Sequence, residues 1–215
     1  MAIGADGKYV FEYVGGRTCL DLANTVGGMR GVHPQEHLHA YPDLVEWARG
    51  AGLVTASHAA RLRAAAERDP ASAERVLRRA RDVREAVHAS VDALRRGEAA
   101  PEADVELLNR ELGRALARQQ LVRRGDGWAL GWPEDGDDLE APLRPAVKSA
   151  AELLSDPDAL ARVHLCAGAE AEDCSWLFLD ETRSGTRRWC SMADCGNRAK
   201  ARRHYARKRR VAGRR

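Results

Sequence analysis

The chain has 215 residues and a formal net charge of +3, and its 44% of hydrophobic residues exclude a protein that is disordered throughout. No apolar run reaches the roughly 18 residues of a membrane-spanning helix, and the N-terminus lacks the basic and apolar regions of a secretory signal. We therefore expect a cytoplasmic protein, in which clustered cysteines indicate metal binding or catalysis before disulfides.

The charge is unevenly distributed along the chain. Residues 183–215 contain 13 Lys or Arg and one acidic residue, a net charge of +12, which leaves −9 for the other 182 residues. An acidic body with a strongly basic end is typical of a protein that binds a polyanion, although a solvated tail would have the same charge.

The first predicted elements are short. Tyr9, Phe11 and Tyr13 alternate with other residues, which predicts a strand or hairpin arm, and the apolar run that begins at Leu20 predicts a helix. The glycine-rich residues 27–40 predict a loop. Three histidines in this loop allow a metal site as an alternative, although no further ligand cluster accompanies them: His33, His37 and His39.

Helices are predicted over most of residues 41–116. A short helix begins near Tyr41, and Ser57 is the expected cap of the next one. The clearest amphipathic pattern follows Pro70 and ends at Gly97, with apolar residues at steps of three and four: Ala73, Val76, Leu77, Ala80, Val83, Val87, Val91 and Leu94. A helix after Pro101 is expected to turn four side chains inward: Val105, Leu108, Leu112 and Leu116.

A hairpin and one or two further helices complete the predicted N-terminal domain. Gly-Asp-Gly at 125–127 lies between two short apolar arms and predicts the hairpin turn. A polar loop follows, and residues 141–163 predict the helices. The fold class is therefore α+β and mostly α. A change in chemistry near residue 163 divides the chain into a mostly helical domain, residues 1–162, and a small C-terminal module, residues 163–215.

Four of the five cysteines form the pattern C-x7-C-x15-C-x4-C: Cys166, Cys174, Cys190 and Cys195. Zinc in a structural site takes four ligands in a tetrahedron, and this number and spacing favour such a site. A hairpin between residues 176 and 189 would bring the two inner cysteines to the same end. Buried apolar thiols, redox chemistry, and replacement of a cysteine by His164 or His204 are the alternatives. Cys19 is interpreted as a buried packing residue.

Two segments resemble known families. The run from Phe178 to Arg209, with Cys-Gly-Asn-Arg at 195–198, resembles the CGNR zinc finger, and GGRTCLDLANTV at 15–26 resembles the ABATE domain that usually precedes it. The family's common Leu-Asp-Phe-Val-Asn-Thr stands here as Leu-Asp-Leu-Ala-Asn-Thr. The resemblance implies a bacterial stress-induced transcriptional regulator with an N-terminal sensing domain. It also implies a DNA-binding end that contains Zn²⁺, with the four cysteines as its ligands.

A basic helix is predicted from about Asn197 onward, with Asn197 as its N-cap. DNA is the expected partner, and most of these side chains would contact phosphates: Asn197, Arg198, Lys200, Arg202, Arg203, Arg207 and Lys208. Three arginines are expected to offset the charge of a zinc–thiolate site: Arg187, Arg188 and Arg198.

The resemblance also implies a small-ligand pocket, to which we assign Arg17, Asp21 and Asn24. From the residues alone we prefer that Asp21 and Asn24 bond local backbone amides at a helix start. No nucleophile–base pair or phosphate loop is found, so we do not expect an enzyme. An RNA-binding module and a protein-interaction module remain alternatives, a homodimer is plausible, and DNA binding would place the protein at the nucleoid.

Overall fold

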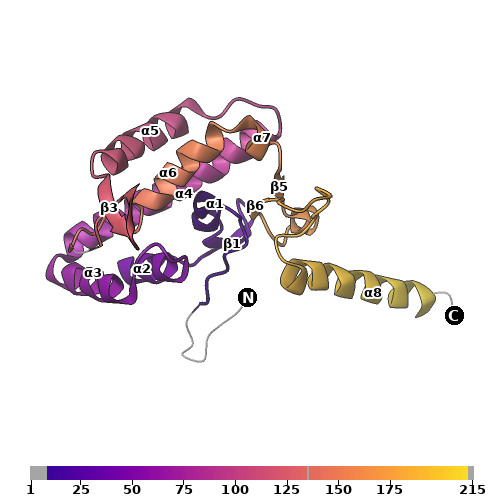
Figure 1. The fold of residues 1–215 in the computed structure, drawn as a ribbon. Coiled ribbons are helices and arrows are strands. Elements are labelled where there is room, and N and C mark those ends of the chain that lie inside the picture. The colour runs from indigo at the N-terminus through magenta and orange to yellow at the C-terminus, as the bar shows by residue number, and fades with distance from the viewer. Residues whose placement is uncertain (1–8, 135, 213–215) are drawn as a thin grey trace.

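The computed structural model describes residues 9–134 and 136–212 (Figure 1). Helices form the body of the molecule: α1 (Thr18–Ala23), α2 (Tyr41–Gly50), α3 (Ala56–Arg68), α4 (Pro70–Arg95), α5 (Glu102–Leu116), α6 (Arg144–Leu154) and α7 (Pro157–Leu160). The strands form antiparallel pairs: β1 (Val26–Met29) with β2 (His33–Glu36), β3 (Gln120–Arg124) with β4 (Gly127–Gly131), and β5 (Val163–Leu165) with β6 (Leu177–Leu179). The prediction of a mostly α, α+β fold is confirmed.

Helix α4 supplies one wall of the main core. It contacts α1, α2, α5 and α6, and the predicted apolar positions from Ala73 to Val91 are buried along it. Cys19 and Leu20 of α1 are fully buried against the same core, as expected for the apolar run. The β5–β6 pair also packs here, since Val163, Leu177 and Leu179 belong to the main core cluster. Packing therefore continues across the boundary proposed at residue 163.

Several local predictions are wrong. Residues 27–40 contain the β1–β2 hairpin instead of a plain loop. Gly31 in the turn has a positive φ angle, and so does Gly28 within β1. The predicted arm with Tyr9, Phe11 and Tyr13 is not a regular strand. Its alternating aromatic side chains pack on the body instead: Tyr13 donates a hydrogen bond to the carbonyl of Trp47, with an oxygen–oxygen distance of 2.8 Å.

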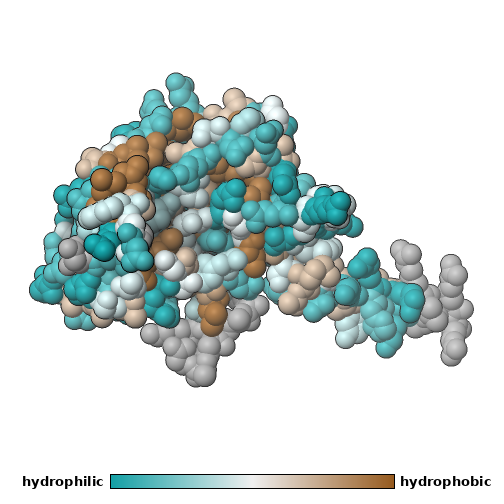
Figure 2. Space-filling view, in the orientation of Figure 1, coloured by the Kyte–Doolittle hydropathy of each residue, from teal (hydrophilic) through white to brown (hydrophobic). Residues whose placement is uncertain are grey.

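The helix caps and one helix face also differ from expectation. Thr55, and not Ser57, caps α3, accepting a hydrogen bond from the backbone N–H of His58. On α5, Leu108 is buried, but Val105 and Leu116 are exposed. The face of the β3–β4 hairpin that carries Leu121, Trp128 and Leu130 is exposed as well, and Figure 2 shows hydrophobic surface in this region.

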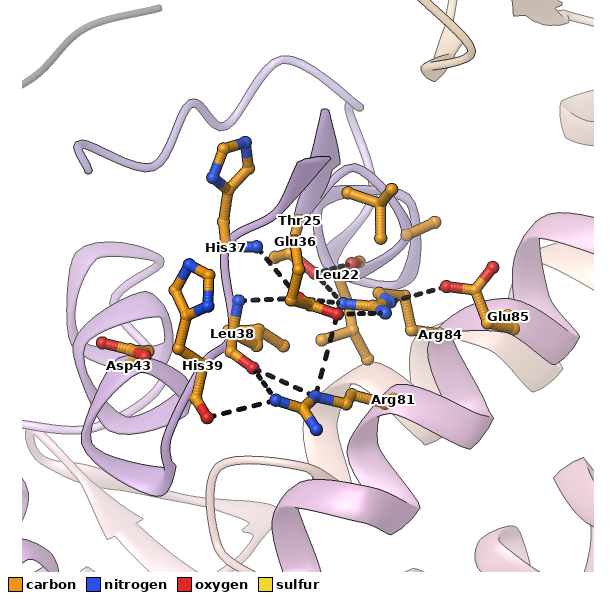
Figure 3. Close-up of polar contacts among 12 residues, drawn as sticks. Leu22, Thr25, Glu36, His37, Leu38, His39, Asp43, Arg81, Arg84 and Glu85 are labelled. Atoms are coloured by element: carbon orange, nitrogen blue, oxygen red, sulfur yellow. Dashed lines mark hydrogen bonds and ion pairs between the residues drawn. The ribbon is translucent and has the colours of Figure 1, made fainter. Parts of the chain in front are cut away.

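A buried ion pair fixes the β1–β2 hairpin on α4 (Figure 3). Two guanidinium nitrogens of Arg84 donate to the carboxylate of Glu36 at 2.6 and 2.8 Å, and the Arg84 side chain is 5% exposed. The same carboxylate accepts the backbone N–H groups of His37 and Leu38. The end of β2 is therefore held in one orientation relative to α4.

Within the described ranges, no helix is both long and apolar enough to cross a membrane.

Candidate metal centre and basic helix

Cys166 and Cys174 lie at the two ends of one short loop. Cys166 directly follows β5, and its backbone N–H donates to the carbonyl of Trp176 at 2.8 Å. A single 3₁₀ turn, Ala167–Ala171, then carries the chain to Cys174, just before β6. Because β5 and β6 are paired, the loop between them must return on itself, and this brings the two thiols together.

Cys190 and Cys195 are brought together by a different turn. Ser191 accepts the backbone N–H of Asp194 and so caps a single π-helical turn, Met192–Gly196. This turn contains Cys195 and continues directly into α8 (Asn197–Ala212). Asn197 is therefore not the N-cap that the sequence predicts, and its side-chain amide donates to the carbonyl of Ala193. The position of α8 thus follows from the position of Cys195.

The four thiols form one buried group. Their ligand atoms lie within 4.8 Å of one another, with sulfur–sulfur distances of 3.8 Å for Cys174–Cys190 and 3.5 Å for Cys190–Cys195. Tetrahedral ligation with metal–sulfur bonds of about 2.3 Å requires sulfurs about 3.8 Å apart. The thiols form no disulfide with one another, and each cysteine is at most 4% exposed. Their arrangement therefore fits a closed metal site with four thiolate ligands.

The surroundings favour thiolate at Cys166 and Cys195, whereas the neighbouring thiols raise the pKa of Cys174 and Cys190. The backbone N–H groups of Gly168 and Cys190 both point at the sulfur of Cys166, at 3.4 Å, and Arg198 donates to the sulfur of Cys195 at 3.0 Å. Hydrogen bonds from the other three thiols hold the pKa of Cys166 far below its ordinary value. A cation at the centre would extend this stabilisation to all four thiolates.

Of the three arginines expected to lie near the sulfurs, only Arg198 donates a hydrogen bond to a sulfur atom. Arg187 lies over the ring of Phe178, at 4.2 Å from its centroid, and donates to backbone carbonyls. Arg188 pairs with Glu170 at the surface. The alternative ligands His164 and His204 are outside the cysteine group, and the described part of the chain contains no second group of this kind. The three histidines at 33–39 are likewise not gathered into such a group.

The predicted hairpin between the inner cysteines is wrong. Only Leu177–Leu179 is a strand, and it pairs with β5 instead of with residues 187–189. Its other edge faces the N-terminal domain. The Asn24 amide donates to the carbonyl of Leu177 at 2.8 Å and accepts its N–H at 3.0 Å. Ser175 donates its N–H to Gly28, and the Trp176 indole donates to Val26. These bonds attach the cysteine module rigidly to the body.

Helix α8 projects away from the body (Figure 1), and residues 200–209 are exposed on all sides. Two of its arginines are used to anchor it: Arg198 pairs with Asp194 at 3.2 Å, and Arg202 pairs with Asp173. Five other residues predicted to bind DNA have side chains at the surface: Asn197, Lys200, Arg203, Arg207 and Lys208. The Asp194–Arg198 spacing of four was readable from the sequence, whereas Asp173 as a partner of α8 was not.

The predicted ligand residues do not act as one set. Arg17 and Asp21 line an open cleft of about 410 Å³ beside α6. Asn24 does not line this cleft, is 2% exposed, and uses its amide to bond Leu177. The cations of the cleft are already paired, Arg17 with Glu181 and Lys148 with Glu152. Asp21 accepts the N–H of Gly15, as the local interpretation expects, and its burial raises the pKa of its carboxyl to about 6.

A helical N-terminal domain is joined to a module whose four buried cysteines fit a metal site and from which a basic helix extends. This arrangement indicates the class of protein, a zinc-finger protein with a helical N-terminal domain. Comparison with known families agrees. Residues 16–157 match the ABATE family model, described as "Putative stress-induced transcription regulator", and residues 162–208 match the CGNR zinc finger. The first match covers more than half of the chain, which therefore belongs to the ABATE family. No curated protein matches the chain.

Proposed function

We propose that this protein is a zinc-dependent transcriptional regulator that binds DNA through α8. The observation that carries the proposal is the exposure of α8. Residues 200–209 are all exposed, with Arg202 paired to Asp173 near the base, and Figure 2 shows this helix as mostly hydrophilic surface. A helix without a packed face gains no stability from burial, and its cations repel one another until a polyanion neutralises them.

The arrangement of the cations supports a phosphate-binding face. At 100° per residue, Lys200, Arg203 and Arg207 lie within about 60° of one another around the helix. Arg198 and Arg202 are held by Asp194 and Asp173, so they orient α8 and contribute less charge to the partner. The proposal assigns the chain no catalytic activity, and it places the protein at the nucleoid in the cytoplasm.

We propose Zn²⁺ as the resident ion, because a closed, buried site with four thiolates is the typical structural zinc site. The residues that would hold it are Cys166, Cys174, Cys190 and Cys195. The ion would supply folding energy and no chemistry, since four thiolates complete its tetrahedral coordination. Elemental analysis of the purified chain should give one zinc per protein, and a different metal or none would contradict this assignment.

The salt dependence of DNA binding tests the function. Four or five phosphate contacts predict a slope of log K against log salt of about −4, since each contact contributes about −0.9 on duplex DNA. Competition between duplex DNA and single-stranded RNA separates the two nucleic acids. A flat line would remove the proposal, and stronger binding to RNA would favour the RNA-binding alternative. Proteins that bind single-stranded RNA stack bases on aromatic side chains. The described part of α8 exposes a single Phe, Trp or Tyr side chain, that of Tyr205, so it gives the RNA-binding alternative limited support.

A further inference from the structure

A second, more enclosed cavity of about 220 Å³ lies between the β1–β2 hairpin and the cysteine module. The hairpin contributes His33, Gln35 and His37 to its walls, and the arm before α1 contributes Tyr9 and Glu12. The module contributes the remaining wall, which borders the metal site and contains Cys174, Cys190 and Cys195 together with Asp173, Trp176, Asp194 and Arg198. The cavity is therefore built by both halves of the chain, unlike the cleft beside α6.

His37, which lines this cavity, has a buried hydrogen-bonding atom without a partner in the described part of the chain. The residue is 9% exposed, and its Nε2 has no hydrogen-bond partner among residues 9–134 and 136–212. Figure 3 shows the imidazole turned away from the Glu36–Arg84 pair, which fixes the backbone on either side of it. The ring stacks on Tyr9, with centroids 3.5 Å apart. A buried polar atom without a partner is uncommon in a folded protein, and a ligand would supply the missing bond.

The imidazole of His37 fits against Gly27 because this glycine has no side chain. A Cβ at this position would lie 2.7 Å from the Nε2 of His37, so any larger residue would displace the ring. Burial lowers the pKa of His37 to about 4, so the imidazole is neutral at pH 7 and one ring nitrogen can accept a hydrogen bond. In the tautomer that carries its proton on Nδ1, the unpartnered Nε2 accepts an N–H of a ligand.

The charged groups that line the cavity favour a ligand of positive charge. Three carboxylates line the cavity, those of Glu12, Asp173 and Asp194, and the four-thiolate site beneath them would keep a formal charge of −2 with a divalent ion bound. Arg198 and Arg202 offset part of this charge through their pairs with Asp194 and Asp173. Glu12 forms no ion pair within residues 9–134 and 136–212. Burial, followed by repulsion from Asp194, raises the pKa of its carboxyl more than the nearby Arg198 lowers it.

We propose that this cavity binds a small organic cation with N–H donors, of the amidine, guanidine or primary amine class. Its charge would pair with Glu12, one N–H would reach Nε2 of His37, and its carbon skeleton would contact Tyr9 and Trp176. The volume of about 220 Å³ admits a molecule of about ten non-hydrogen atoms, well below the 300–1,000 Å³ usual for drug-sized ligands.

Occupation of the cavity acts directly on the base of α8. A cation near Asp173 and Asp194 competes with Arg202 and Arg198 for these carboxylates, and those two pairs orient the helix. The ligand therefore changes how α8 is held, and by linkage DNA changes the affinity for the ligand by the same factor. This regulatory consequence rests on the proposed DNA binding, whereas binding of the cation does not.

The test is a calorimetric and NMR titration of the zinc-loaded full chain, without DNA. Benzamidine, agmatine and putrescine are the cationic probes, and benzamide is the neutral isostere of benzamidine. We expect at least one cation to bind with a Kd below about 1 mM, the affinity reasonable for nine or ten atoms. We expect benzamide to bind at least about tenfold more weakly than benzamidine, and the amide signals of residues 33–37 to shift.

Glu12→Gln should weaken binding of the cations by about tenfold, equivalent to about 1.4 kcal/mol. His37→Phe, which keeps the stacking ring and removes the acceptor, should weaken it as well. Glu170→Gln is the control, since Glu170 is an exposed carboxylate of the same module and does not line the cavity. Failure of all three cations to bind, equal binding of benzamide, or unchanged binding by Glu12→Gln would overturn the proposal. A separate DNA titration with and without the best probe measures the regulatory effect.

Discussion

The amide of Asn24 forms two hydrogen bonds with the backbone of Leu177, although 153 positions separate the two residues in the chain. The bonds lie on the edge of β6 that is not paired with β5. The Asn24 side chain therefore pairs with both backbone groups of Leu177, as a residue of a neighbouring strand would. One side chain of the N-terminal domain thereby aligns the segment between Cys174 and Cys190. The Leu-Asp-Leu-Ala-Asn-Thr motif thus has a structural role in joining the domain to the metal module.

Replacement of this amide should destabilise the protein. Asn24→Ala leaves a buried N–H and a buried carbonyl of Leu177 without partners, and the expected cost is about 2–4 kcal/mol. Urea denaturation of the zinc-loaded protein measures it. Asn109→Ala, an exposed position on α5, should stay within about 0.5 kcal/mol of the parent protein. Equal stability of the two variants would show that the two hydrogen bonds contribute little.

Metal removal should loosen only part of the module. Val163, Leu177 and Leu179 are packed in the main core, so the β5–β6 pair should remain protected when the ion is chelated. The loops that carry the cysteines bury little else, so residues 166–174 and 187–200 should exchange their amide hydrogens much faster. Hydrogen exchange with and without chelator measures this, and Cys190→Ser should give the same pattern without chelator. Loss of protection in β6 would contradict the expectation.

The cysteine site and most helices could be predicted from sequence because their signals are local. The spacing indicated the four cysteines that the fold brings together, and the period of three to four residues predicted the buried side of α4. The β1–β2 hairpin could not be predicted, because glycine turns and polar strand residues carry no alternating apolar pattern. The pairing of β6 was missed for another reason. A hairpin with residues 187–189 is closer in sequence, but Leu177 and Leu179 have a larger core to pack against beside β5.

The stability of the protein should depend on pH through Asp21. Burial raises the pKa of this carboxyl from 3.8 to about 6, so the folded state favours the protonated form, and the residue costs stability as the pH rises from about 4 to about 6. Asp21→Asn keeps the oxygen that accepts the N–H of Gly15 and removes the charge. It should stabilise the protein by about 3 kcal/mol at pH 8 and by roughly half of that at pH 5.

Urea denaturation of both proteins at pH 5 and pH 8 tests this expectation. The difference between the variants is the informative quantity, because loss of metal at low pH affects both in the same way. A variant that is less stable than the parent at pH 8, or a difference that does not change with pH, would show that Asp21 is not held in its unfavourable ionised form.

The Glu36–Arg84 pair should contribute more than the neighbouring Arg84–Glu85 pair of α4. Glu36→Gln leaves the buried guanidinium without its main carboxylate, and we expect a loss of about 2–3 kcal/mol. This is below the range for fully buried pairs because the Glu36 side chain is 32% exposed. Glu85→Gln, whose carboxylate is half exposed, should cost less than about 1 kcal/mol. Equal losses in thermal or urea denaturation would contradict this ranking.

Neighbouring arginines of α8 should differ in their contribution to DNA binding. Arg203 is exposed and has no ion pair among the described residues, so Arg203→Ala should reduce the slope of log K against log salt by about 1. Arg202 already pairs with Asp173, so Arg202→Ala should change the slope less and should loosen the first turns of α8. Arg75→Ala on α4 is the control, since it removes the same charge far from α8. If the two α8 variants change the slope equally and leave exchange in α8 unaltered, the Arg202–Asp173 pair does not anchor the helix.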